Sequence, residues 1–373
     1  MKKDTSRFLK RHVLTKAFKR YFILAFALWV TVSLFAVITS NVFLNSLSDY
    51  YIANPDIYRE YREVQEVYIA PDGGNSEPKE FYVVTEKDTI SVDIPDYAIL
   101  DINTFRGCMQ LIRIDFPAAT KEINPDWFNK PDLPKLAEIN VHPSNKHYST
   151  KNGILYNKDK TKLIFFPWSH ELYEGSNRET EYTLPSSVKV IGKGAFRDNS
   201  FLEAIIFNST LKTIEERAFY NCKKLEDITL PSSLEKVDKG AFAECKNIES
   251  VQISINSKFT EIAESAFMKC ESLKVINIPN NVKNIGKWAF SGCSFLQVIS
   301  LPSGIEVIDD FAFANCTRLG NLYISSTIQY IGRGAFQHSS AQLSFQQSKP
   351  SENWDKNWKH QLNNEPQWGV NFP

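Results

Sequence analysis

Cysteine and histidine are the side chains of this chain best suited to metal binding or redox chemistry, and each type occurs six times. Five cysteines follow a phenylalanine by three residues, and Cys108 stands in the same place after Phe105. This spacing matches no C-x-x-C metal or redox motif and indicates a structural column. Buried thiols and disulfides between neighbours both fit such a column, and we expect free thiols. The five are Cys222, Cys245, Cys270, Cys293 and Cys316.

The histidines show no catalytic spacing. No two stand four residues apart around a glutamate, as a metalloprotease helix requires, and we interpret them as exposed loop residues rather than metal ligands. The sequence also lacks a G-x-S-x-G nucleophile elbow and a G-x-x-x-x-G-K-[ST] phosphate loop. It therefore predicts no enzymatic activity, no catalytic residue, no cofactor and no metal site. The histidines are His12, His142, His147, His170, His338 and His360.

Recurring phenylalanines show how the chain is organised. Seven stand at steps of 23, 23, 25, 23, 23 and 23 residues, and each is preceded by alanine. A period in the twenties is typical of a solenoid, whose units are too small to bury their apolar faces alone and therefore stack. Two weaker copies upstream carry Phe105 and Phe128. The seven are Phe196, Phe219, Phe242, Phe267, Phe290, Phe313 and Phe336.

Each unit is predicted to contain one short strand. In one unit Leu225, Ile228 and Leu230 occupy the first, fourth and sixth places of an L-x-x-I-x-L run, and proline ends the strand because it offers no donor. These places point inward and stack in columns, whereas the second and fifth places point outward. The fifth-place residues are Ile206, Thr229, Gln252, Asn277, Ser300 and Tyr323, and the second-place residues are Glu203, Glu226, Glu249, Lys274 and Gln297.

This outward face is the candidate ligand face. Its fifth place varies from unit to unit while the inner columns repeat, and solenoids commonly bind through one continuous face. Neutral sequence drift on a surface without a function would give the same variation. The three glutamates of the second place suggest a calcium or catalytic row, but lysine and glutamine replace them in later units. We therefore interpret that row as a solvated strand face.

The units resemble the BspA-type leucine-rich-repeat family. The resemblance rests on L-P-S-S-V-K-V-I-G-K-G-A-F at 184–196 and L-P-S-S-L-E-K-V-D-K-G-A-F-A-E-C at 230–245, and it covers roughly residues 90 to 370. It implies a leucine-rich-repeat solenoid of the α/β horseshoe class, built mostly of short parallel β-strands and turns. It also implies a surface protein that binds proteins, or glycans, in adhesion or recognition.

Two departures from simple repetition are also similar to that family. Residues 153–167 contain two apolar runs around an Asn-Lys-Asp-Lys turn and predict an inserted β-hairpin. The terminal segment carries Trp354, Trp358 and Trp368. We interpret these tryptophans as the core of a cap rather than a ligand-stacking platform, because the last coil of a solenoid must be covered.

The N-terminal region predicts a membrane anchor. Residues Tyr21–Ser48 carry no charge over 28 positions, and about 20 apolar residues span a bilayer. Basic residues precede the span and none follows within ten positions, which places the N-terminus in the cytoplasm and the array at a cell surface or in a periplasm. A cleaved signal peptide is the alternative, although its apolar region is usually only about 7–15 residues long. The basic residues are Lys2, Lys3, Arg7, Lys10, Arg11, Lys16, Lys19 and Arg20.

The remaining chain carries a matching excess of acidic residues and no basic stripe, so no nucleic-acid partner is expected. After the span, an Asn-Pro-Asp start signal and an apolar stripe ending at Tyr68 predict a helix that covers the first coil; a mobile stalk is the alternative. The predicted parts are a basic cytoplasmic tail (1–20), a transmembrane signal-anchor (21–44), a stalk or N-terminal cap (45–89), the repeat array (90–340) with the hairpin insert near 140–183, and a C-terminal cap (341–373).

Together these features predict a single-pass membrane protein whose external array binds a protein or glycan without catalysis. The alternative function is an envelope or assembly scaffold whose array contacts a partner from the same cell. An enzyme ranks third because the insert shows no nucleophile, base or metal set.

Overall fold

The computed structural model describes residues 67–69, 80–84, 88–128, 130–169 and 180–371 of the 373-residue chain, all within the unit Glu63–Pro373. The predicted basic tail, the predicted membrane span and most of the predicted stalk lie outside these residues, as do His12 and His170. No helix within the described residues combines the length and apolar character that a membrane crossing requires.

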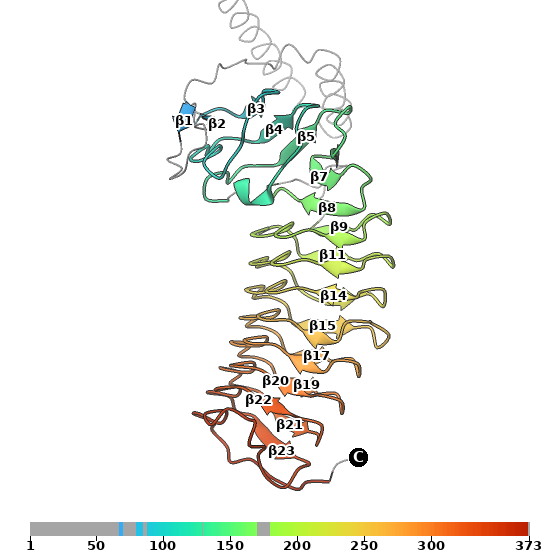
Figure 1. The fold of residues 1–373 in the computed structure, drawn as a ribbon, viewed down its shortest axis with the longest axis vertical. Coiled ribbons are helices and arrows are strands. Elements are labelled where there is room, and N and C mark those ends of the chain that lie inside the picture. Colours follow the sequence, from blue (N-terminus) through green and yellow to red (C-terminus); the bar gives the residue numbers. More distant parts are fainter. Residues whose placement is uncertain (1–66, 70–79, 85–87, 129, 170–179, 372–373) are drawn as a thin grey trace, which may run out of the picture. The chain divides into compact units, whose positions relative to one another are not determined.

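Coils of the array contribute two short strands each, where the sequence pattern predicts one. The first strand contains the fourth and fifth places of the apolar run, and a two-residue strand follows the next turn. Strands of each kind pair in parallel with their counterparts in neighbouring coils, and Figure 1 shows them stacked one above another. The first strands are β9 (Glu181–Thr183), β11 (Ala204–Ile206), β13 (Ile228–Leu230), β15 (Ser250–Ile253), β17 (Val275–Asn277), β19 (Val298–Ser300), β21 (Asn321–Ile324) and β23 (Gln342–Phe345). The second strands are β10 (Val190–Ile191), β12 (Thr213–Ile214), β14 (Lys236–Val237), β16 (Glu261–Ile262), β18 (Asn284–Ile285), β20 (Val307–Ile308) and β22 (Tyr330–Ile331).

The Ala-Phe turn forms the third side of each coil and has its own ladder of hydrogen bonds. The amide of each of the first six repeat phenylalanines donates to the carbonyl of the alanine in the next coil, as from Phe242 to Ala266 at 2.9 Å. Residues two before and two after the phenylalanine have left-handed backbone, with φ between 53° and 78°, and their amides also donate to the next coil or the cap. Left-handed backbone costs a residue with a side chain roughly 1–2 kcal/mol, so this ladder favours glycine.

The expected solenoid of short parallel strands and turns is confirmed, but this third side corrects its assignment to the α/β horseshoe class. A repeat of the α/β horseshoe class has a helix opposite its strand, whereas the only helical element of the described residues is the 3-10 helix η2 (Pro125–Trp127). The chain is a parallel β-solenoid in which a hydrogen-bonded turn takes the place of the helix.

The N-terminal coils follow the same plan. Strands β3 (Ser91–Asp93), β4 (Arg113–Phe116) and β5 (Glu138–Val141) pair in parallel. Before them, β1 (Val67–Ile69) pairs antiparallel with β2 (Glu80–Tyr82). Tyr68 therefore lies in a strand, and the helix predicted to end there is wrong at this point. The local Val-Tyr-Ile sequence favours a strand because β-branched and aromatic residues suit a pleated surface.

The predicted hairpin insert is confirmed and is larger than expected. Strands β7 (Ile154–Asn157) and β8 (Lys162–Phe165) pair antiparallel, and β6 (Tyr148–Lys151) adds a third strand. The β6–β7 turn is Asn152-Gly153, both residues with positive φ, which is the preferred sequence for a two-residue hairpin turn. Strand β8 also pairs in parallel with β10, so the insert forms the start of the second-strand ladder.

Two apolar cores meet at the insert. The larger core runs from Ile154 to Trp358, and the smaller one contains the N-terminal coils with Leu155 and Phe165. Successive residues of β7 point to opposite cores because side chains alternate along a strand. Each core has its own aromatic column, so the adjacent residues Phe165 and Phe166 end one column and begin the next.

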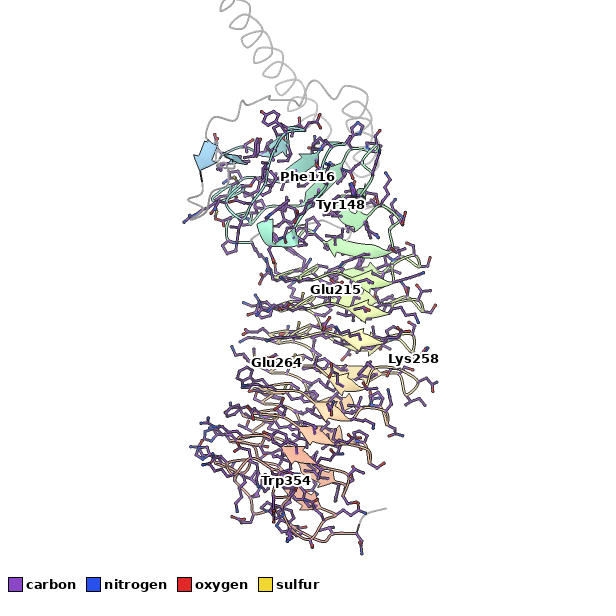
Figure 2. All side chains as sticks on the ribbon, in the orientation of Figure 1. Phe116, Tyr148, Glu215, Lys258, Glu264 and Trp354 are labelled. Atoms are coloured by element: carbon purple, nitrogen blue, oxygen red, sulfur yellow. The ribbon has the colours of Figure 1, made fainter. Side chains whose placement is uncertain are left out.

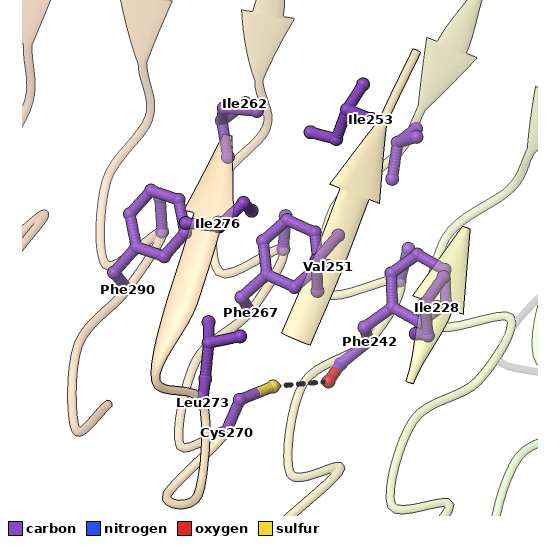
Figure 3. Close-up of a cluster of buried hydrophobic side chains, with 14 of the residues drawn as sticks. Ile228, Phe242, Val251, Ile253, Ile262, Phe267, Cys270, Leu273, Ile276 and Phe290 are labelled. Atoms are coloured by element: carbon purple, nitrogen blue, oxygen red, sulfur yellow. Dashed lines mark hydrogen bonds between the residues drawn. The ribbon is translucent and has the colours of Figure 1, made fainter. Parts of the chain in front are cut away.

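Stacked phenylalanine rings run through the larger core. From Phe196 to Phe336 the centroids of neighbouring rings are 4.8–5.7 Å apart, and their planes differ by 11° or less. Figure 3 shows three of these rings in a row, with Ile228, Val251 and Ile276 of the first strands beside them. The predicted column of buried phenylalanines is therefore confirmed.

The array ends on a cluster of tryptophans. Trp354 and Trp358 are buried, as predicted, and with Trp368 they surround Phe345 of β23 at centroid distances of 4.5–5.8 Å. An isolated bridge between Ser344 and Gln367 continues the ladder by one residue. The last coil is thus covered by its own chain.

Candidate interaction surface

All six cysteines are free and buried, in agreement with the expected thiol column. Each of the five regularly spaced thiols donates to the carbonyl oxygen of the phenylalanine one coil earlier, as from Cys270 Sγ to Phe242 O at 3.2 Å (Figure 3). Burial raises the pKa values of Cys222, Cys270, Cys293 and Cys316, so these thiols stay protonated at neutral pH. The thiolate is the nucleophile and metal ligand, so these cysteines are structural.

The described histidines are exposed, as expected, and they are His142, His147, His338 and His360. Next to the first pair, sequence reasoning missed Asn145, which is fully buried. Its amide group donates to the carbonyls of Pro117, Ala118 and Thr120, and its oxygen accepts two backbone amides. Asn145 therefore fixes the loop that leads into the insert.

The glutamates of the second place lie on the surface among lysines. Glu203 pairs with Lys224 at 3.1 Å and Glu249 with Lys274 at 2.7 Å, one coil further along in each case. Hydrogen bonds from Lys224 and Thr180 lower the pKa of Glu203. Among the described residues, no three His, Cys, Asp or Glu side chains gather as metal ligands. Glu203 and Glu249 therefore form ion pairs with lysines at the solvated surface of the strands.

The fifth-place residues share one exposed face. Ile206, Thr229, Gln252, Asn277, Ser300 and Tyr323 are all exposed and lie on successive first strands. Strand register places Thr229 opposite Gln252 and Asn277 opposite Ser300. The second-place residues Glu226, Glu249, Lys274 and Gln297 are exposed just before the strands, and Glu203 is partly exposed. The structure therefore brings the eleven predicted residues together along one side of the array.

Asn277 has a structural task on this face. Its side-chain oxygen accepts the amide of Ile253 at 2.9 Å, and its nitrogen donates to the carbonyl of the same residue at 2.7 Å. The β15–β17 pairing ends one residue earlier, where the 25-residue coil begins its longer loop. The Asn277 side-chain amide thus takes the place of a missing pair of backbone hydrogen bonds, and both of its polar atoms are used inside the fold.

Sequence reasoning missed the third place of the run, which lies on the same side of the strand as the fifth. Val275 and Val298 occupy it on neighbouring strands, are register partners, and are 44% and 61% exposed. Because side chains alternate along a strand, the inward fourth place already implied an outward third place. This alternation is the sequence signal from which Val275 and Val298 could have been identified.

Aromatic and cationic side chains extend the exposed apolar area. Phe295, just before β19, lies under the guanidinium of Arg318 at 3.8 Å from its centroid, and Tyr323 on β21 is 50% exposed. We name the set Val275, Phe295, Val298, Arg318 and Tyr323 the apolar patch. Tyrosine and arginine are enriched among residues that dominate protein interfaces.

The earlier part of the strand face differs in character. It carries the lysine–glutamate pairs described above. It also carries Asp227, which accepts a hydrogen bond from the Ser250 hydroxyl at 2.6 Å. In Figure 2, Lys258 marks the edge with the loops that follow the first strands, and Glu264 lies at the opposite, Ala-Phe edge. Between these edges the earlier coils carry paired charges together with the exposed Phe201 and Ile206, and more apolar and aromatic groups are exposed toward the C-terminus.

Comparison with known proteins identifies the repeat. A family model described as BspA type leucine rich repeat region matches six copies over residues 80–174, 168–258 and 251–353. A solved leucine-rich repeat protein from Eubacterium ventriosum ATCC 27560 is 25% identical, with a TM-score of 0.57, over 67% of this chain and 64% of that one. One from Bacteroides ovatus ATCC 8483 is 20% identical, with a TM-score of 0.44, over 76% and 61%. The pneumococcal vaccine antigen PcpA is 17% identical, with a TM-score of 0.42, over 81% and 83%.

The chain spans less than two thirds of the length of the first two of these structures. Among curated proteins, none matches the chain. The family model covers well over half of the sequence, and its repeat coincides with the coils described above. The chain belongs to the BspA-type leucine-rich repeat family.

Proposed function

We propose that this protein binds a protein partner non-covalently through the strand face, with the apolar patch as the centre of contact. The observation that carries this proposal is the exposure of Val298 and Tyr323 on neighbouring strands, beside Val275 and the Phe295–Arg318 pair. Water-exposed apolar groups gathered in one place are typical of interaction sites. Burying them against a partner contributes roughly 25 cal/mol per Å² of apolar area.

The family supports an external location for this contact. We propose that residues 21–44 anchor the chain in a membrane with its N-terminus in the cytoplasm. Residues 45–89 then form a stalk or N-terminal cap, residues 90–340 form the repeat array, and residues 341–373 form the C-terminal cap. An external protease applied to intact cells tests this topology. We expect digestion of the array and survival of an N-terminal epitope. Complete protection would place the array in an enclosed compartment and favour the envelope-scaffold function.

Photo-crosslinking tests the binding surface. A photoreactive amino acid replaces Val298 in the apolar patch and, in a matched control, Ile255, which is 80% exposed in the loop after β15. We expect a discrete protein adduct from position 298 and none from position 255. Equal adducts from both positions, or none from 298, would rule out the strand face as the contact surface.

A further inference from the structure

Charged side chains are distributed unevenly along the strand face. In the coils of β11, β13 and β15, the outward second, third and fifth places hold four acidic residues and no basic residue. In the coils of β17, β19 and β21, the same places hold no acidic residue, and their one basic residue is Lys274. The apolar patch lies in these later coils. The four acidic residues are Glu203, Glu226, Asp227 and Glu249.

The lysines beside the apolar patch already have carboxylate partners. Lys274 Nζ lies 2.7 Å from the Glu249 carboxylate, and Lys246 Nζ lies 2.6 Å from the Glu271 carboxylate. The backbone carbonyl of Glu271 accepts the Phe295 amide at 3.1 Å, so the second pair borders the patch directly. The positive charges of both lysines are therefore compensated within the fold.

Arg318, within the patch, has no such partner. The residue is exposed, and the centre of its guanidinium group lies 3.8 Å from the ring centroid of Phe295. In the part of the chain that the structure describes, this guanidinium forms no ion pair and donates no hydrogen bond. An arginine side chain has five N–H donors and no acceptor. The patch thus contains a positive charge that the fold does not compensate.

The Phe295 ring keeps this charge beside the apolar groups. A cation is attracted to the negative face of an aromatic ring, and the contact restricts a side chain that would otherwise be mobile. Guanidinium is also more weakly hydrated than ammonium, so it suits an interface from which water is removed. A charge that is covered without an acceptor opposes association. A partner that covers the patch must therefore bring an acceptor for Arg318.

We propose that the protein segment bound at the apolar patch carries an aspartate or glutamate flanked by apolar residues, and that its carboxylate binds Arg318. This proposal rests on the protein-binding function proposed above and names the chemistry of the partner. A carboxylate accepts two parallel N–H···O bonds from one guanidinium, which a single neutral acceptor does not. The apolar neighbours of that carboxylate then cover Val298 and Tyr323, which are 61% and 50% exposed.

The earlier coils oppose the same segment. Glu226 and Asp227 are adjacent and exposed at the start of the β13 coil, and among the described residues neither forms an ion pair. Like charges brought together across an interface select against a wrong partner or a wrong position. An acidic segment is therefore favoured at the patch and disfavoured over β13, whereas a basic segment has the opposite preference.

Peptide selection tests this preference. The full chain, purified in detergent, is used to select from a library of random peptides displayed on phage, and a parallel selection on Val298→Glu identifies the peptides that depend on the patch. The peptides are joined to the coat protein at their C-terminal end, so every selected carboxylate belongs to a side chain. We expect the patch-dependent peptides to be enriched in aspartate or glutamate next to apolar residues.

Affinities of the selected peptides, synthesised with amidated C-termini, are then measured by fluorescence anisotropy. Arg318→Glu should weaken binding by about tenfold or more, whereas the control Arg333→Glu, at an exposed arginine on the Ala-Phe edge, should leave it unchanged. Replacing the peptide's acidic residue by its amide should cause a similar loss, and this loss should disappear when Arg318→Gln is already present. The change in the peptide tests the contact without altering the protein.

The outcomes separate this proposal from the binding function itself. Patch-dependent peptides without acidic enrichment, or with affinity that survives Arg318→Glu, would overturn the proposal and leave the protein-binding function in place. Independent effects of the peptide change and Arg318→Gln would overturn it as well, because two groups in contact must show coupling. A library without any peptide that depends on Val298 would overturn both.

Discussion

Replacing Phe242 by alanine tests the stacked core near its centre. The Phe242 ring is fully buried, and its centroid lies 5.1 Å from that of Phe219 and 5.6 Å from that of Phe267, with planes 4° and 3° apart. Truncation leaves a cavity between two rings that the backbone ladders hold in place. Phenylalanine-to-alanine changes in such sites cost about 3–5 kcal/mol of unfolding free energy. The two ring contacts account for roughly 1–3 kcal/mol of that loss.

The solenoid determines how this loss appears. Each coil contacts only its neighbours, so a weak coil in the middle reduces the coupling between the two halves of the array. We expect urea unfolding, followed by circular dichroism, to begin at lower denaturant concentration and to broaden. Limited proteolysis with mass spectrometry should locate new cleavage sites in the coils around residue 242.

Phe311 supplies a matched control of the same residue type. It lies outside the core and has left-handed backbone, so Phe311→Ala should change the unfolding free energy by less than about 1 kcal/mol. A Phe242→Ala loss below about 1 kcal/mol, or equal losses from the two variants, would refute the stacked-core reasoning.

Three further predictions concern the ladders and the thiols. Gly286→Ala would place a Cβ atom 2.8 Å from the backbone nitrogen of Glu264, so we expect it to lower the unfolding free energy by about 1–3 kcal/mol or more. In the control Gly304→Ala the new Cβ atom would have only one atom nearby, at 3.9 Å, so this variant should be neutral or slightly stabilising. Equal Tm values for the two variants would contradict this expectation. Asn277→Ala leaves the Ile253 backbone groups unpaired and should cost about 1–3 kcal/mol in denaturant unfolding, while Gln252→Ala on the same face should have little effect; a neutral Asn277→Ala would show that its side-chain hydrogen bonds do not stabilise the fold. Burial raises the pKa values of four thiols above the value of about 8.5 of an unfolded cysteine, so their contribution to stability is complete below that pH and declines as pH rises toward the folded-state values. A variant with these four cysteines replaced by alanine should show a flatter decline of the urea midpoint between about pH 8 and 10, and an unchanged slope would mean that the thiols do not cause it.

The inner columns could be predicted from the sequence because they repeat at a fixed period. The register of Phe242 with its six counterparts, and of the cysteines three residues later, is visible without a structure. The second strands were not predicted because a strand such as Lys236–Val237 is too short to show alternation. Glycine marks the left-handed turn position before the Ala-Phe pair in only three of the seven coils, whereas Arg217, Ser265, Trp288 and Phe311 occupy it in the others, so the sequence shows this turn in part.

The candidate surface was predicted in part. The fifth-place residues lie together as expected, but the patch depends equally on Val275 and Val298, which the choice of the second and fifth places left out. The hydrogen bonds of the Asn277 side chain depend on the two extra residues of the neighbouring coil, because the strand pairing stops before Ile253 there. Such an effect arises from pairing between coils and is not visible in one unit.

The affinity of the full chain for the protein captured at position 298 decides whether the strand face is the binding surface. Val298→Glu puts a charge into the apolar patch, and Ile255→Glu makes the same kind of change at an exposed residue in the loop after β15. Val298→Glu should weaken binding by about tenfold or more, because a buried unpaired charge opposes association, while Ile255→Glu should leave binding unchanged. Equal affinities for both variants would contradict the strand face as the binding surface.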